Sequence, residues 1–127
     1  MKIKFDPTEG LIVIPTRLHG HHADTIARLA LDTGATVSMI NWDLAVLIGY
    51  DPAASKERIR ITTGSGVEFA PRIQLKKVEI SGRTLENFPI LCHTLPPTAT
   101  IDGILGLDFF RGICLMIDLK EGTLTFN

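Results

Sequence analysis

Short apolar runs, separated by turn-forming residues, extend along most of this 127-residue chain. Runs rich in Val, Ile, Leu and Thr that alternate with polar residues are typical of β-strands. On this pattern we predict strands over residues 2–5, 11–18, 24–31, 36–40, 58–62, 67–73, 75–80, 85–93, 113–119 and 123–126. The chain is therefore predicted to belong to the all-β class.

Two stretches interrupt the strand pattern in an informative way. Residues 42–48 predict a short helix, which Asn41 is suited to cap and which Gly49 is suited to end. The glycine-rich sequence of residues 63–66, Thr-Gly-Ser-Gly, joins two predicted strands and indicates a hairpin. Glycines keep such a tip mobile, which suits a lid more than a support.

A candidate for chemistry lies where an apolar strand ends, in residues 29–36, Leu-Ala-Leu-Asp-Thr-Gly-Ala-Thr. A carboxylate there lies at the mouth of the core, where ionisation is costly unless the group is hydrogen-bonded or shares its proton. Gly34 permits a tight turn and the close approach of another backbone. Asp-Thr-Gly alone would more often be an ordinary turn, so the rest of the chain decides its meaning.

A second element lies downstream, where Ile104-Leu105-Gly106 is followed by Leu-Asp-Phe-Phe. An apolar-apolar-Asp-Thr-Gly-Ala loop, a glycine-tipped hairpin and an apolar-apolar-Gly run occur in this order along nearly the whole chain. This order resembles the retropepsin-like aspartic peptidases. The resemblance implies a single-domain acid-protease fold over residues 1–127, a closed β-barrel with a flap hairpin and one or two short helices.

The sequence departs from the viral members of that family. Viral enzymes often pair an Asp after the Asp-Thr-Gly loop with an Arg after the downstream Gly, but Thr36 and Leu107 occupy these positions here. The hairpin tip also lacks the viral Gly-Gly. The chain therefore resembles the cellular and bacterial branch more than the viral enzymes.

Peptide hydrolysis by this route needs two carboxylates that share one proton around a water molecule. The chain has one Asp-Thr-Gly, and neither Asp102 nor Asp108 has the Thr-Gly continuation. Asp108 is instead expected to serve the terminus of a short helix. The resemblance therefore implies a homodimer in which Asp32 faces Asp32 of a second copy across a two-fold axis.

The same resemblance implies roles for the neighbours of Asp32. Thr33 would interlock with its symmetry mate, Gly34 would offer a carbonyl to the substrate backbone, and Ala35 would keep the pocket wall small. An extended peptide or protein substrate would bind under the flap, with no metal and no organic cofactor. The expected substrate-binding residues of the flap tip are Thr63, Gly64, Ser65 and Gly66.

Other interpretations of the same sequence remain open. The chain fits a catalytically weak or inactive binding and dimerisation module of the same fold, or a domain of a larger protein whose partner surface lies elsewhere. In viral enzymes the chain termini interleave into a shared sheet, and residues 2–5 and 123–126 are candidates for this arrangement. The substrate and the pH optimum are not encoded in any pattern of the sequence.

The composition excludes several functions. Thirteen Lys and Arg residues against fourteen Asp and Glu residues give a net charge of −1, without the basic excess of a nucleic-acid-binding protein. No apolar run approaches the ~20 residues of a membrane span, and no N-terminal stretch has the order of a signal peptide. We therefore expect a cytoplasmic protein without nucleic-acid or membrane partners.

Two further groups of side chains receive structural interpretations. Cys92 and Cys114 each lie in an apolar run, so we expect buried, reduced thiols. His19, His21 and His22 lie in a polar connection with no apparent fourth ligand for a metal. We expect this connection to be a solvated loop.

Overall fold

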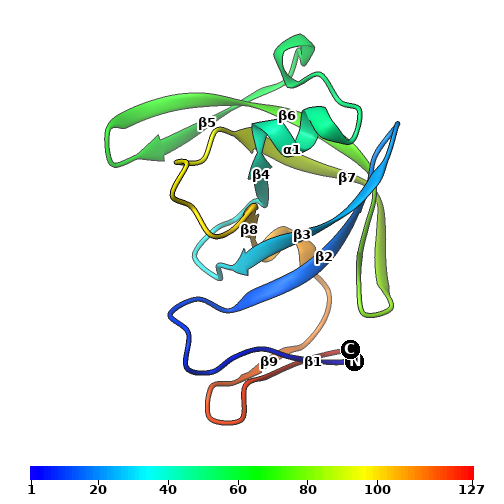
Figure 1. Ribbon diagram of the computed structural model, residues 1–127, viewed down its shortest axis with the longest axis vertical. Coiled ribbons are helices and arrows are strands. Elements are labelled where there is room, and N and C mark those ends of the chain that lie inside the picture. Colours follow the sequence, from blue (N-terminus) through cyan, green and yellow to red (C-terminus); the bar gives the residue numbers. More distant parts are fainter.

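β-Strands dominate the computed structural model, which describes residues 1–62 and 64–127 (Figure 1). The strands are β1 (Lys2–Lys4), β2 (Val13–His19), β3 (Asp24–Leu31), β4 (Met39–Asn41), β5 (Arg58–Thr63), β6 (Gly66–Ile80), β7 (Arg83–His93), β8 (Gly103–Leu105), β9 (Leu115–Asp118) and β10 (Thr123–Phe126). The helical segments are α1 (Trp42–Leu47) and two 3-10 turns, η1 (Pro52–Ala54) and η2 (Leu107–Phe109). None of the helices in the described part of the chain is long and apolar enough to span a membrane.

Six of the strands close into a barrel. The larger sheet has the order β2-β3-β8-β4-β7-β6-β5, and an additional pairing of β2 with β6 joins its two sides. β5 lies outside this ring and forms a hairpin with β6 that projects from the barrel (Figure 1). The predicted all-β fold with a closed barrel is thus confirmed.

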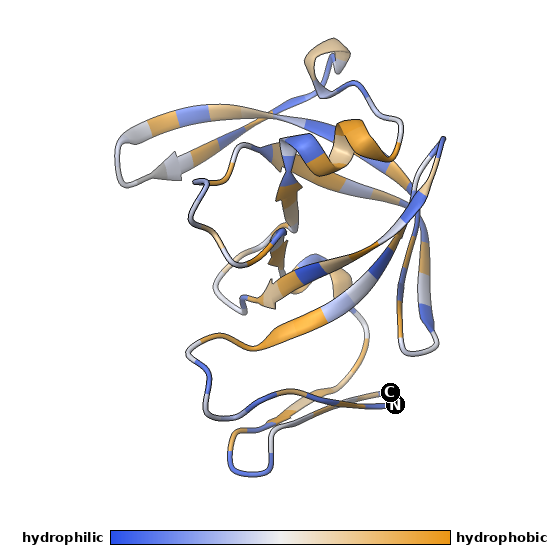
Figure 2. Ribbon diagram, viewed as in Figure 1, coloured by the Kyte–Doolittle hydropathy of each residue, from blue (hydrophilic) through white to orange (hydrophobic). Residues whose placement is uncertain are grey.

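The core fills this barrel because each strand turns alternate side chains inward. In β2, Ile14, Thr16 and Leu18 are buried while the residues between them are not, and the same alternation of hydropathy is visible along β6 (Figure 2). Phe109 is fully buried and packs edge-on against Phe110, and Phe110 packs edge-on against Phe126. Edge-to-face packing of this kind adds specificity to the burial of apolar surface.

Some predicted boundaries were wrong for identifiable reasons. The predicted strands 67–73 and 75–80 form one continuous strand, β6, because its first part pairs with β5 and its second part with β2 and β7. The predicted helix is present, and Gly49 follows it with a positive φ of 105°. Asn41, however, makes no side-chain capping hydrogen bond. Its Oδ1 instead accepts a hydrogen bond from the Leu95 N–H at 3.5 Å.

The two chain termini pair with each other. β10 lies between β1 and β9 in a three-stranded antiparallel sheet, so both of its edges are occupied within the same chain. This sheet forms the lower end of the molecule in Figure 1, where the two termini lie side by side. The termini therefore do not need a second copy to form a sheet.

The two cysteines differ in their surroundings. Cys92 is buried as predicted, and burial raises the pKa of its thiol to about 12. Cys114 is exposed, so the prediction of burial was wrong for this residue. It precedes β9 at the edge of the terminal sheet, where its backbone pairs with that of Asn127.

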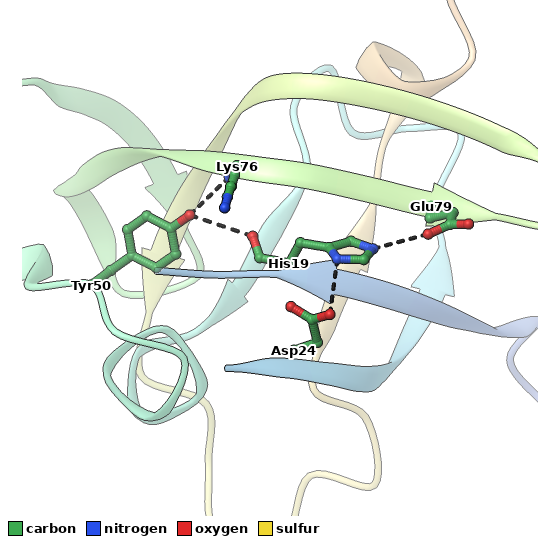
Figure 3. Close-up of polar contacts among 5 residues, drawn as sticks. All are labelled: His19, Asp24, Tyr50, Lys76 and Glu79. Carbon is green, nitrogen blue, oxygen red and sulfur yellow. Dashed lines mark hydrogen bonds and ion pairs between the residues drawn. The ribbon is translucent and has the colours of Figure 1, made fainter. Parts of the chain in front are cut away.

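His19 lies in β2 rather than in a solvated loop, which corrects the prediction for this histidine. Its Nδ1 lies 3.0 Å from Asp24 Oδ2 on β3, and its Nε2 lies 2.9 Å from Glu79 Oε1 on β6 (Figure 3). Beside it, the Lys76 N–H donates to the Tyr50 hydroxyl at 2.8 Å. The ring thus joins three strands where the barrel closes. In the described part of the chain, no group of three or more His, Cys, Asp and Glu residues is arranged to hold a metal ion.

This contact predicts how stability depends on pH. The hydrogen bond with His19 lowers the pKa of the Glu79 carboxyl below its ordinary value of 4.5. A carboxyl with a lowered pKa in the folded state stabilises the protein above its unfolded pKa, and this contribution is lost as the pH falls. We expect the Glu79→Gln variant to lose less stability than the wild type between about pH 5 and about pH 3 in urea unfolding.

The exposed Glu121 provides a matched control for that measurement. Glu121→Gln removes a carboxylate from a turn and should retain the acid sensitivity of the wild type. If the free energy of unfolding depends on pH equally in the wild type and in Glu79→Gln, the contact between His19 and Glu79 does not contribute to acid sensitivity.

Candidate active site

The loop that carries Asp32 begins at the end of β3 and is held by the backbone of the segment after β8. β3 and β8 are parallel, with Leu31 opposite Leu105. The Asp32 N–H donates to the Leu105 carbonyl at 3.0 Å, and the Leu107 N–H donates to the Ala35 carbonyl at 2.9 Å. The loop is therefore bound at both of its ends by segments about seventy residues away in sequence, and such long-range bonds fix its position.

Within the loop, the Asp32 carboxylate is oriented by its neighbours. The Gly34 N–H donates to Asp32 Oδ1 at 2.9 Å, and the Ala35 N–H donates to the Asp32 carbonyl at 3.1 Å. Asp32 is partly buried, whereas Thr33 and Gly34 are exposed. One carboxylate oxygen is thus held by a backbone donor, and the loop is open to solvent on its outer side.

Two glycines allow the downstream segment to approach this closely. A Cβ at Gly106 would lie 2.8 Å from the carbonyl oxygens of both Ala35 and Val37, and a Cβ at Gly103 would overlap the Met39 carbonyl. Real Cβ atoms do not approach backbone oxygens at such distances. The apolar-apolar-Gly run therefore ends in glycine because the Asp32 loop passes directly against it.

Ser38 and Asp108 connect the same two segments through their side chains. The Ser38 hydroxyl donates to Asp108 Oδ1 at 2.6 Å, and the Ser38 N–H donates to Oδ2 at 2.9 Å. The hydroxyl oxygen accepts in turn from the Gly106 N–H at 2.9 Å. Ser38 is fully buried, so this network satisfies polar groups that water does not reach.

This network adds to the prediction for Asp108. The residue lies in the first turn of η2, the predicted short helix, and its carboxylate also accepts two hydrogen bonds from Ser38. Thr36 and Leu107 lack the ion pair of viral enzymes, and the neighbouring Ser38–Asp108 contact joins the same two segments. Sequence reasoning missed Ser38 because a buried serine carries no local signal of a partner seventy positions away.

A cavity of 460 Å³ opens beside the loop, between it and the β5 strand of the projecting hairpin. Its walls are mostly apolar and are contributed by Gly34, Ala35, Thr36, Val37, Met39, Ile59, Arg60, Ile61, Thr62, Leu91 and Ile104. A concave, mainly apolar site next to an oriented carboxylate is the usual form of a substrate cleft.

The predicted site residues are distributed unevenly around this cavity. Gly34 and Ala35 line it, while Asp32 and Thr33 lie in the same loop beside it. Gly64, Ser65 and Gly66 lie at the hairpin tip and are not part of its wall, and Thr63 lies outside the described residues. The hairpin contributes its β5 strand instead. The alternation of Ile59 and Ile61 was the sequence signal that could have indicated this.

Asp102, another aspartate that could be considered as a partner for Asp32, makes its hydrogen bond outside the Asp32 loop. Its Oδ2 accepts a hydrogen bond from the Arg28 N–H at 2.8 Å. Asp108 is likewise bound to Ser38. Neither side chain bonds to Asp32 or its loop neighbours in the described part of the chain.

Comparison with known proteins agrees with this geometry. The sequence model of a family described as "Aspartyl protease" matches residues 14–109. The chain belongs to the aspartyl protease family. No match is found among curated protein sequences.

Solved structures show the same fold. A retropepsin-like aspartic protease from Rickettsia conorii superposes with a TM-score of 0.76 at 22% identity, covering 100% of this chain and 89% of that one. The retroviral protease-like domain of Ddi1 from Leishmania major gives 0.60 at 22% identity, covering 94% and 90%. The simian foamy virus (mac) protease gives 0.50 at 16% identity, covering 75% and 87%. The predicted resemblance to retropepsin-like proteases is confirmed, and the structure is more similar to the bacterial and cellular structures than to this viral one.

The buried network predicts the effect of one substitution. Ser38→Ala removes the hydroxyl partner of the Gly106 N–H and of Asp108 Oδ1, while the backbone N–H still bonds to Oδ2, so we expect a loss of about 1–3 kcal/mol in the free energy of unfolding. Urea denaturation would measure it. Thr36→Ala, at an exposed threonine two residues away, should change stability by less than about 0.5 kcal/mol. Equal effects of the two substitutions would argue against the bridge.

Proposed function

We propose that this protein is an aspartic endopeptidase that acts as a homodimer, with Asp32 of each copy forming the catalytic pair. The observation that carries the proposal is the Asp32 loop. A carboxylate oriented by the Gly34 N–H lies beside a mainly apolar cleft, in a chain of the aspartyl protease family. Each copy would contribute residues 1–127 as one peptidase domain.

The chemistry requires one carboxylate in each protonation state. The ionised carboxylate would remove a proton from water, which attacks the peptide carbonyl carbon, while the protonated carboxyl gives its proton to the carbonyl oxygen. Collapse of the tetrahedral intermediate would break the C–N bond as the amine nitrogen takes a proton from the pair. The two groups would share one proton as a unit, so neither chain's Asp32 is the acid or the base in advance.

The second carboxylate would come from a second copy of this chain. Asp102 and Asp108 are engaged with Arg28 and Ser38, and an isologous two-fold contact brings identical residues near the axis together. Thr33 is exposed beside Asp32 and would contact its symmetry mate there. Because both edges of β10 are filled, a second copy could extend the terminal sheet only at the outer edge of β1 or β9.

The β5–β6 hairpin would act as the flap over an extended peptide. Its inner strand contributes Ile59 and Ile61 to the cavity, opposite Val37 and Ile104. An apolar wall of this kind would favour substrates with an apolar side chain next to the cleaved bond. Gly64, Ser65 and Gly66 would meet the substrate only when the tip moves over it.

The first test is the loss of peptide cleavage in Asp32→Asn. Asparagine keeps the size of the side chain but cannot carry the proton, so we expect cleavage of a diverse peptide library between about pH 4 and about pH 7 to fall by several orders of magnitude. Asp43→Asn, at an exposed position of α1, is the matched control and should retain activity. Cleavage that survives in Asp32→Asn would contradict the proposal. A dimeric wild type that cleaves nothing would favour a binding module.

Mixing the wild type with Asp32→Asn tests whether the pair is made by two chains. If both carboxylates are required, only dimers of two wild-type chains are active, and activity follows the square of the wild-type fraction. An equal mixture at constant total concentration should then show about a quarter of the unmixed activity rather than about half. A linear dependence would indicate that one chain is sufficient.

A further inference from the structure

The hairpin formed by β5 and β6 extends beyond the strand pairing that joins β6 to the barrel. The ladder between β6 and β7 ends at the pair of Arg72 and Leu91, so the part of β6 closer to the tip has no backbone pairing with β7. In Figure 1 this part of the hairpin extends away from β7. Its position relative to the barrel must therefore depend on side chains.

The two faces of the hairpin are different. Arg60 is opposite Phe69 and Thr62 is opposite Val67, so these side chains share one face of the hairpin; Phe69 is 63% exposed. On the other face Ile59 is opposite Ala70, which is 1% exposed. Glu68 belongs to this inner face because it is opposite Ile61. The Glu68 carboxylate remains partly exposed and has its hydrogen-bond partner outside the hairpin.

His93, at the end of β7, is that partner. Its Nε2 lies 2.7 Å from Glu68 Oε2, and its Nδ1 lies 3.0 Å from the Thr94 carbonyl oxygen. Each ring nitrogen thus lies within hydrogen-bond distance of an oxygen that can accept from an N–H. The side chains of His93 and Glu68 are 33% and 44% exposed. The contact is therefore a charge-assisted hydrogen bond that solvent can still reach.

A groove lies under this contact. Its volume is 470 Å³, and Trp42, Phe69 and Cys92 contribute to its walls together with Glu68 and His93. It is separate from the cavity beside Asp32, because the two share no lining residue. Trp42 is the single tryptophan of the chain and is partly buried. It lies where a movement of the hairpin would change its exposure.

We infer that Glu68 and His93 form a latch that docks the β5–β6 hairpin on the end of β7 and sets its resting position beside the substrate cleft. As positioning residues they would act on substrate through the hairpin, and this consequence rests on the proposed peptidase function. The latch itself is a property of the protein without substrate. Substrate binding then begins with the hairpin already docked, which lowers the conformational cost of closing it.

Acrylamide quenching of Trp42 fluorescence tests the latch without substrate. Glu68→Ala should raise the ratio of undocked to docked hairpin by roughly 1.5- to 5-fold, the change expected for the loss of one partly exposed charged pair. Quenching should increase accordingly. Glu68→Gln, which keeps an acceptor at the same position, should give a smaller increase. Glu86→Ala, at an exposed glutamate elsewhere on β7, is the matched control and should behave like the wild type.

A double-mutant cycle decides whether the two side chains act together. If they form one latch, His93→Ala should increase quenching about as much as Glu68→Ala, and the double variant should show no further increase. Additive effects, or quenching in Glu68→Ala equal to that of the wild type, would overturn the inference. Circular dichroism of each variant would confirm that the barrel remains folded.

Peptidase kinetics separate the latch from the catalytic proposal. If the protein cleaves peptides, Glu68→Ala should raise KM and leave kcat nearly unchanged, because the hairpin is less ordered before binding while Asp32 is untouched. If no cleavage is found, the fluorescence result still decides whether the latch exists. The two proposals can therefore fail independently.

Discussion

The close contact between the Asp32 loop and the segment after β8 is the constraint on which the rest of the structure depends. Two backbone hydrogen bonds, from Asp32 to Leu105 and from Leu107 to Ala35, hold two parts of the chain that are far apart in sequence. The contact is possible only because Gly106 has no side chain. It fixes β3 beside β8 and so determines where the barrel ends and where the carboxylate lies.

The buried Ser38–Asp108 bridge strengthens this contact without a full ion pair. Burying a salt bridge costs the solvation energy of two charged groups. Here only the Asp108 carboxylate is charged, and the neutral N–H and hydroxyl of Ser38 replace the water that would otherwise bond to it. The position of Asp32 thus depends on hydrogen bonds with fixed geometry rather than on long, charged side chains. This suits a site in which small displacements of a carboxylate would change its contact with water and substrate.

Two histidine side chains add contacts between strands to the hydrogen bonds of the backbone ladders. His19 connects three strands where β2 meets β6, and His93 connects the projecting hairpin to β7. Both rings lie between two oxygen acceptors. Ladder hydrogen bonds hold the barrel strands together, whereas the part of the hairpin beyond the last pair of the β6–β7 ladder contacts the end of β7 through Glu68 and His93.

Local patterns predicted the elements of this fold better than the contacts between them. β3 and β10 have the predicted bounds because alternation and turn residues act within a few positions. The order of the Asp-Thr-Gly loop, the glycine-tipped hairpin and the downstream Ile-Leu-Gly run indicated the family. The sequence did not reveal that Ser38 bonds to Asp108, that Glu68 faces inward, or that β5 rather than the hairpin tip lines the cavity. These features depend on which strands become neighbours, and this information is not local.

The proposed catalytic pair, built from two copies of one loop, raises a question of symmetry. Acid and base must differ, yet identical chains related by a two-fold axis would give both Asp32 side chains the same surroundings. A proton shared between them makes neither one the acid in advance. A peptide has a direction, so its binding removes the symmetry and assigns the two roles. Under the proposed function, the direction of the bound peptide would determine which Asp32 acts as the acid and which acts as the base. One Asp-Thr-Gly motif per chain would then be enough for both roles.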